Sequence, residues 1–153
     1  PETFSDTGES SRLRVVLLLA GTNDLADVTN DIDASVHRIV ENIWGLHTLC
    51  HEAGLRTMCI GIPAGRHQTQ DMSAVRATVN VMLSGRCRAT PHADYVPFPI
   101  AYSRTNELWD ADGLHLSECG YGVLGTLLYR SVRVALGEVA PRPYRDCAPS
   151  DFR

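Results

Sequence analysis

Three polar side chains in two short motifs could together carry out acyl chemistry. Asn23 lies in Gly-Thr-Asn-Asp, directly after an apolar run, and Asp112 and His115 stand three residues apart in Asp-Gly-Leu-His. A histidine can act as a general base near neutral pH, and a carboxylate beside it can fix its tautomer and stabilise its protonated form. An asparagine amide can stabilise the oxyanion that forms when an ester carbonyl is attacked. These groups supply most of what ester hydrolysis requires, apart from a serine nucleophile.

Each motif alone also has an ordinary structural explanation. Asp112-Gly113 is a common turn pair, and Gly21 and Asn23 are residue types that often stand where a strand passes into a helix. The combination is more specific than either part, because one motif follows a buried strand and the other precedes an amphipathic helix. Gly21 and Asp24 flank the Thr-Asn pair and support the first motif.

The apolar pattern predicts alternating strands and helices within one domain. Strands are expected at 14–20, 57–62 and 94–98, and helices at 32–53, 71–84 and from the cap residue Ser117 to Gly137. Residues 1–12 and 138–153 are expected to be irregular tails of a single, partial domain that spans residues 1–153. This alternation favours an α/β fold with a parallel sheet, right-handed crossovers and helices on its faces. Because the carboxyl ends of parallel strands share one edge, both motifs should converge there.

Apolar spacing also predicts which face of each helix is buried. The predicted faces are Ile32, Val36, Ile39, Val40, Ile43, Leu46, Leu49 and Cys50 on the first helix, Val75, Thr78, Val79, Met82 and Leu83 on the second, and Tyr121, Leu124, Leu127, Leu128, Val132 and Leu136 on the last.

The sequence resembles the SGNH, or GDSL, hydrolases. VVLLLAGTNDL and WDADGLHLSECGYGVLG are similar to the third and fifth sequence blocks of that family, and the likeness extends over roughly residues 13–137. The resemblance implies a flavodoxin-like three-layer α/β/α sandwich and hydrolysis of carboxylic esters by a Ser-His-Asp triad without a cofactor or metal. It assigns Asp112 and His115 to the triad and Asn23 to the oxyanion hole, with a small-molecule ester as substrate.

The nucleophile block of that family has no counterpart here. In the family, a strand ending in Gly-Asp-Ser lies well upstream of the Gly-Thr-Asn-Asp motif, whereas only twenty residues precede Gly21. Ser5, Ser10 and Ser11 are the serines in those residues. Ser11 would enter the first strand at its amino end, about 26 Å from the catalytic edge at ~3.3 Å per residue. The sequence therefore predicts a fold that lacks its first strands, with an unknown nucleophile and a chain that is inactive alone.

A missing neighbour strand would leave residues 14–20 as an exposed, apolar sheet edge. Such edges are usually paired or covered in natural proteins. We therefore expect that another strand of a longer chain, or a second chain, can pair there.

Composition narrows the other possibilities. The net charge is −4, all 14 basic residues are Arg, and they form no basic block, which argues against nucleic-acid binding. No apolar run is long enough to span a membrane, and the polar N-terminus does not resemble a signal peptide. The odd number of cysteines, five, favours free thiols and a reducing compartment such as the cytoplasm.

Two further groups have open interpretations. His47 and His51, with Cys50 between them, have a spacing that can hold zinc, but exposed helix positions explain them as well, and we predict no metal site. The aromatic residues Tyr95, Phe98, Tyr102 and Trp109 either line a substrate pocket or pack the last loop onto the sheet.

Two alternative functions stay open beside ester hydrolysis. The chain could be an inactive relative, or ligand-binding module, that retains the fold. A flavodoxin-like nucleotide or flavin domain is less favoured, because no Gly-rich phosphate loop follows the first strand.

Overall fold

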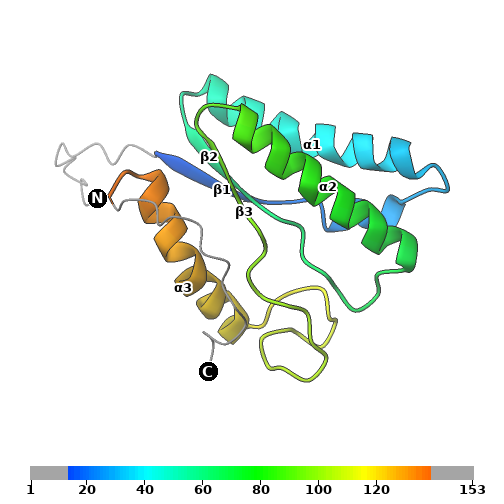
Figure 1. The fold of residues 1–153 in the computed structure, drawn as a ribbon. Coiled ribbons are helices and arrows are strands. Elements are labelled where there is room, and N and C mark those ends of the chain that lie inside the picture. Colours follow the sequence, from blue (N-terminus) through cyan, green and yellow to red (C-terminus); the bar gives the residue numbers. More distant parts are fainter. Residues whose placement is uncertain (1–13, 139–153) are drawn as a thin grey trace, which may run out of the picture.

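The computed structural model describes residues 14–138 (Figure 1). Ser5, Ser10, Ser11 and Cys147, and the predicted tails apart from Glu138, lie outside these residues. The elements in chain order are β1 Val15–Leu19, the 3-10 helix η1 Asn23–Asp27, α1 Ile32–Glu52, β2 Arg56–Ile60, α2 Gln70–Ala89, β3 Ala93–Val96 and α3 Glu118–Ala135.

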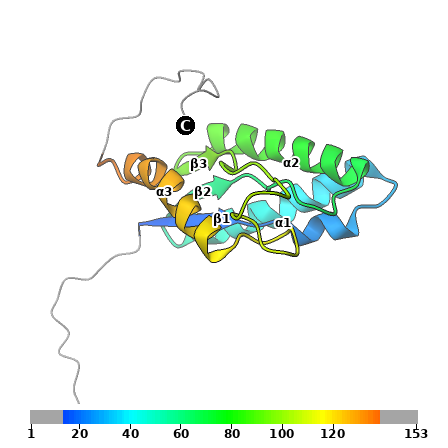
Figure 2. The same cartoon turned by 90° about the horizontal axis from the view of Figure 1, so that it is seen from below.

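The three strands form a parallel sheet in the order β1-β2-β3. In this sheet Met58 of the central strand pairs with Leu17 of β1 and with Asp94 of β3. Helices α1 and α2 cover one face of the sheet and α3 covers the other (Figures 1 and 2). The predicted three-layer α/β/α arrangement with a parallel sheet is therefore confirmed.

Each face of the sheet has its own hydrophobic core. On the α1/α2 side the buried residues are Leu25, Val36, Ile39, Val40, Ile43, Cys59, Ile62, Val75, Val79, Leu83 and Cys87. On the α3 side they are Ile60, Ile100, Trp109, Leu116, Leu124 and Leu128. Because side chains alternate along a strand, adjacent residues of β2 serve opposite cores: Cys59 packs on one side and Ile60 on the other.

Side-chain caps fix where the helices begin. Asp31 accepts a hydrogen bond from the amide of Ala34, and Thr69 accepts one from Met72. Ser117 accepts one from Gly120 and caps α3, as the sequence predicts. Each cap accepts a hydrogen bond from an amide that has no partner inside its helix. The cap therefore fixes the residue at which the helix begins.

Strand β1 lies at the edge of the sheet in the part of the chain that the structure describes, since it pairs only with β2. Leu17 is 40% exposed and Leu19 is 39% exposed, on the face toward α3. The expected apolar edge at residues 14–20 is therefore present within residues 14–138.

The ends and faces of two helices differ from the sequence prediction. Helix α2 continues five residues past Ser84 to Ala89, because Leu83 and Cys87 lie one turn apart on the buried face and extend the packing. Leu46, Leu49, Thr78 and Met82 were predicted to be buried and are exposed, because the buried stripe of each helix is narrower than the predicted face. Within residues 14–138, no helix is both long and apolar enough to cross a membrane.

The four cysteines in the described part of the chain, Cys50, Cys59, Cys87 and Cys119, are free thiols. Cys59 and Cys87 are buried in the core between the sheet and α2.

Candidate functional site

The first motif begins with a glycine that no other residue could replace without strain. Gly21 has φ +99°, and a Cβ there would lie 2.6 Å from Ile62 Cδ1 and 2.8 Å from Ile43 Cδ1. The chain can therefore turn sharply at the carboxyl end of β1 only because this residue has no side chain. The turn leads at once into η1, whose first residue is the exposed Asn23.

Asp24 joins this turn to α1. Its Oδ1 accepts a hydrogen bond from Asn42 Nδ2 at 3.1 Å and lies 4.0 Å from Arg38 Nη1. Arg38 also donates to the carbonyl of Asp27 at 3.0 Å. These contacts hold η1 against the helix and so fix the position of Asn23.

The second motif lies in a closed loop between β3 and α3. Trp109 and Leu116 pair as an isolated antiparallel bridge, and both are buried in the core beneath α3. Inside the bridge, the amide of Asp110 donates to the carbonyl of His115, and the amide of Gly113 donates to the carbonyl of Asp110, both at 2.9 Å. The loop is therefore held by its own backbone and by two apolar anchors.

Asp112 and His115 form a hydrogen-bonded pair within this loop. His115 Nδ1 lies 2.6 Å from Asp112 Oδ2, while the amides of Leu114 and His115 donate to Asp112 Oδ1 at 2.8 and 3.0 Å. These hydrogen bonds, first of all the one from the His115 side chain, hold the pKa of Asp112 well below its usual value. An ionised Asp112 favours the tautomer with a proton on Nδ1, which leaves Nε2 to accept a proton from another group.

The loop after β2 supports the same motif from outside. The amide of Arg66 donates to the carbonyl of Gly113 at 2.8 Å, and Arg66 Nη1 donates to the carbonyl of Ala111 at 3.3 Å. Gly113 has φ +65°, and a Cβ there would collide with the Cβ of Arg66. The Asp-Gly-Leu-His turn is therefore possible only with glycine at its second position.

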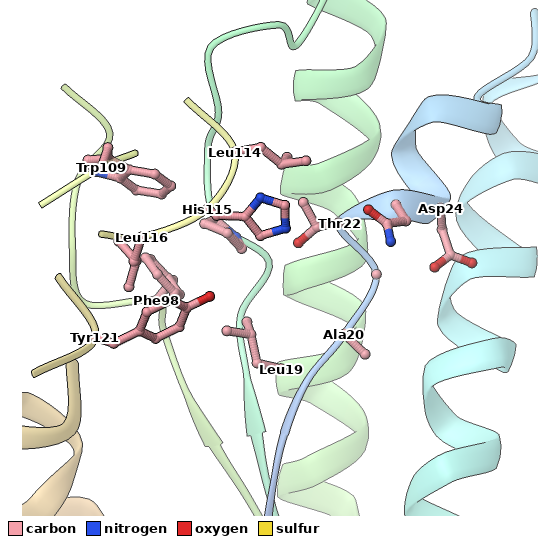
Figure 3. A pocket seen from close by; sticks show the side chains of 13 residues that line it. Leu19, Ala20, Thr22, Asp24, Phe98, Trp109, Leu114, His115, Leu116 and Tyr121 are labelled. Carbon is pink, nitrogen blue, oxygen red and sulfur yellow. The ribbon is translucent and has the colours of Figure 1, made fainter. Parts of the chain in front are cut away.

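Both motifs open onto one cavity of about 340 Å³ at the carboxyl ends of the strands (Figure 3). Its lining residues are Leu19, Ala20, Gly21, Thr22, Asn23, Asp24, Pro63, Phe98, Trp109, Leu114, His115, Leu116 and Tyr121. Figure 3 shows the His115 ring near the turn that carries Thr22, with the hydroxyl of Tyr121 directed into the same space. The structure thus brings together Asn23 and His115, which are far apart in the sequence.

No serine or cysteine is among the residues of the described chain that line this cavity. Ser5, Ser10 and Ser11 lie outside the described residues, so the nucleophile is not identified by the structure. His115 is 62% exposed at its side chain and Asp112 is 47% exposed, so the pair is open to solvent in this chain.

The aromatic residues near the last loop divide between the two interpretations left open by the sequence. Phe98 and Trp109 line the cavity, whereas Tyr95 packs against the core between the sheet and α2. Tyr102 makes an edge contact with Trp109 at a ring distance of 5.2 Å, outside that cavity. Trp109 is 8% exposed and donates to the carbonyl of Ala101 at 3.1 Å, so it anchors the loop as well as lining the pocket.

His47 and His51 are structural neighbours of one hydroxyl. His47 Nδ1 lies 2.7 Å from Thr57 Oγ1, and His51 Nε2 lies 2.9 Å from the same atom. The exposed position expected for His47 is wrong, because this ring is fully buried and stacks on Trp44 at 4.9 Å. Burial, together with the nearby His51, lowers the pKa of His47 to about 4.

Tyr121 was predicted on the buried face of the last helix, and Thr22 and Leu114 were not predicted as site residues. All three line the cavity, and Tyr121 is 52% exposed. For Thr22 and Leu114, the sequence signal for a place in the site was their position in the two motifs, directly before Asn23 and His115. Tyr121 lay one turn into a helix, where spacing alone could not separate a pocket wall from a core contact.

Comparison with solved structures gives two similar folds. One is a proposed acylhydrolase from Bacteroides fragilis, with a TM-score of 0.61, 19% identity, and coverage of 80% of this chain and 62% of that one. The other is a proposed platelet activating factor from Streptococcus pneumonia, with a TM-score of 0.55, 20% identity, and coverage of 78% of this chain and 59% of that one. This chain therefore shares the α/β fold of these two structures.

The chain covers less than two thirds of the length of each of these two structures. The chain spans 62% and 59% of the lengths of these two structures. At 19% and 20% identity, the likeness establishes the fold and no activity. No family model matches the sequence, and no curated protein matches it.

Proposed function

We propose that this chain is part of a serine-dependent carboxylic ester hydrolase of the SGNH/GDSL type. The observation that carries the proposal is the shared cavity of Asn23 and His115, with Asp112 bonded to the far nitrogen of the imidazole. A neighbouring fold described as a proposed acylhydrolase supports the same class of reaction.

In this mechanism His115 Nε2 removes the proton from a serine hydroxyl as the hydroxyl attacks the ester carbonyl. Asp112 keeps the Nδ1 proton in place and stabilises the imidazolium that forms. His115 then gives the proton to the leaving alcohol. Water, activated by the same base, attacks the acyl-enzyme and releases the acid.

The side chain of Asn23 donates to the oxyanion of the tetrahedral intermediate. It is suited to that task because η1 is fixed to α1 through Asp24 and Asn42, so the amide needs little reorganisation. Phe98, Trp109 and Leu114 supply an apolar wall for the acyl or alcohol group of a small ester.

The serine comes from a segment outside residues 14–138. We propose that this segment pairs with the free edge of β1, because a parallel strand placed there would end beside Gly21 and so beside the cavity. The same pairing would cover the exposed Leu17 and Leu19.

Hydrolysis of a short-chain p-nitrophenyl ester tests the proposal. We expect little or no turnover by residues 1–153 alone, and turnover that depends on His115 when the nucleophile segment is present. A fluorophosphonate probe should label one serine of that segment and fail to label it after His115→Ala. Strong hydrolysis by residues 1–153 that His115→Ala does not change would rule out this mechanism. Absence of labelling in the complete protein would favour an inactive binding module.

A further inference from the structure

A second pocket is lined in part by the segment 110–113, and His115 is not among its lining residues. It has a volume of about 300 Å³ and is lined by Arg66, Tyr102, Ser103, Arg104, Asn106, Trp109, Asp110, Ala111 and Gly113. It shares the Trp109 ring with the first cavity and otherwise has its own walls. None of these polar side chains has a part in the mechanism above.

The charges in this pocket are unbalanced. Two arginines, Arg66 and Arg104, and one acidic residue, Asp110, line it. Within residues 14–138 neither arginine forms an ion pair. Asp110 uses Oδ1 to accept the amide of Ala111 at 2.7 Å, so part of its charge is already engaged by the backbone.

Arg66 is preorganised for a ligand. Its backbone amide and one guanidinium nitrogen donate to the carbonyls of Gly113 and Ala111, which directs the side chain along the pocket wall, and its other guanidinium N–H groups have no hydrogen-bond partner among residues 14–138. The hydroxyls of Tyr102 and Ser103 and the amide of Asn106 add neutral donors. A pocket with two arginines and neutral donors matches the planar, multidentate recognition of an oxyanion.

We propose that this pocket binds a phosphate-type oxyanion, either free or carried by a molecule whose apolar part occupies the first cavity. An anion there would draw Arg66 and Arg104 together against the loop that carries Asp112 and His115. The site does not depend on ester hydrolysis, since its residues are separate from the proposed triad.

Trp109 provides a direct reporter, because the chain has only two tryptophans and Trp109 lines this pocket. In a Trp44→Phe background, its fluorescence should change saturably with inorganic phosphate at constant ionic strength, and chloride should not reproduce the change. Arg66→Gln and Arg104→Gln should each weaken phosphate binding roughly tenfold, because each removes charge-assisted hydrogen bonds. Arg88→Gln is the matched control, since Arg88 is exposed on α2, hydrogen-bonds to Ser84 and does not line this pocket.

Butyl phosphate distinguishes the two sources of the anion. Tighter binding of butyl phosphate than of phosphate, with the gain lost in Phe98→Ala, would show that the anion belongs to a molecule that fills both pockets. Equal binding would show a site for the free anion. Absence of saturable binding of both probes, or equal weakening by Arg88→Gln, would overturn the proposal.

His115→Ala separates this inference from the proposed function. We expect it to leave phosphate affinity within about twofold while removing ester hydrolysis. Phosphate binding without any esterase activity in the complete protein would refute the hydrolase mechanism and leave the anion site standing. Esterase activity without phosphate binding would refute the anion site and leave the hydrolase mechanism standing.

Discussion

His115 and His47 each place a ring nitrogen close to one oxygen atom, at 2.6 Å from Asp112 Oδ2 and at 2.7 Å from Thr57 Oγ1. His115 lies in a loop with its side chain 62% exposed and an ionised partner, whereas His47 lies inside α1, fully buried, with a neutral one. His115 thus has a carboxylate as its partner at an exposed position, whereas burial opposes protonation of His47. The surroundings of a histidine, and not its residue type, therefore decide whether it is suited to proton transfer or to packing.

The largest expected effect tests the difference in catalytic role. In a protein that contains the nucleophile segment, His115→Ala should reduce kcat for a p-nitrophenyl ester by at least about 10⁴-fold, because the serine loses its base. His47→Gln should leave kcat within about twofold, since His47 is remote from the cavity lining. A similar loss of kcat in both variants, with both still folded by circular dichroism, would contradict the distinction.

Asn23 tests whether the cavity serves the reaction of His115. Asn23→Ala should lower kcat by about 100- to 1,000-fold with a small change in KM, because an oxyanion donor acts mainly in the transition state. Asn30→Ala is a suitable control, since Asn30 is also exposed and lies outside the cavity lining. An effect confined to KM would assign Asn23 to ground-state binding instead.

His47 should link stability to pH, in a range where Asp112 does not. Its pKa falls from 6.5 to about 4 on folding, so between these values the unfolded chain binds the proton more readily. Stability should therefore decrease as the pH falls from about 6.5 to about 4, by roughly 3 kcal/mol in total. The groups that face this ring are Trp44, His51 and Thr57, with Arg86 above Trp44 and Glu41 paired to Arg86.

Urea unfolding at several pH values measures this linkage. His47→Gln should flatten the decrease between pH 6.5 and 4. Asp112→Asn should leave that range unchanged, because the pKa of Asp112 is depressed on folding and its contribution disappears only as the pH falls below about 3.8. A wild-type slope that His47→Gln does not alter would show that another group titrates there.

Two glycine substitutions sharpen the contrast between loop and helix with the smallest expected effects. Gly113→Ala should destabilise the fold by about 1–3 kcal/mol, because φ is +65° and the new Cβ meets Arg66. Gly45→Ala, two residues from His47, should stabilise it by about 0.5–1 kcal/mol, because Gly45 lies inside α1 with open space around it. Thermal unfolding reports both shifts, and opposite signs are required.

The burial of His47 could have been predicted in part from the sequence. It continues the buried series Val36, Val40 and Ile43 at helical spacing, which favours a core position. Its residue type suggested solvent or a metal instead. What the helix pattern could not supply was Thr57, whose hydroxyl on β2 satisfies Nδ1.

Sequence alone determined the local features of this protein. An unbroken apolar run specifies β1, Ser117 specifies the start of α3, and the three-residue spacing of Asp112 and His115 already allows their hydrogen bond within one turn. Only the tertiary structure decided that Asn23 and His115 line one cavity and that Tyr121 and Thr22 join them. The physical reason is the sequence separation of the interacting residues. Caps and i,i+3 contacts depend on neighbours in the chain, whereas the cavity depends on how the parallel sheet brings separate loops to the same end.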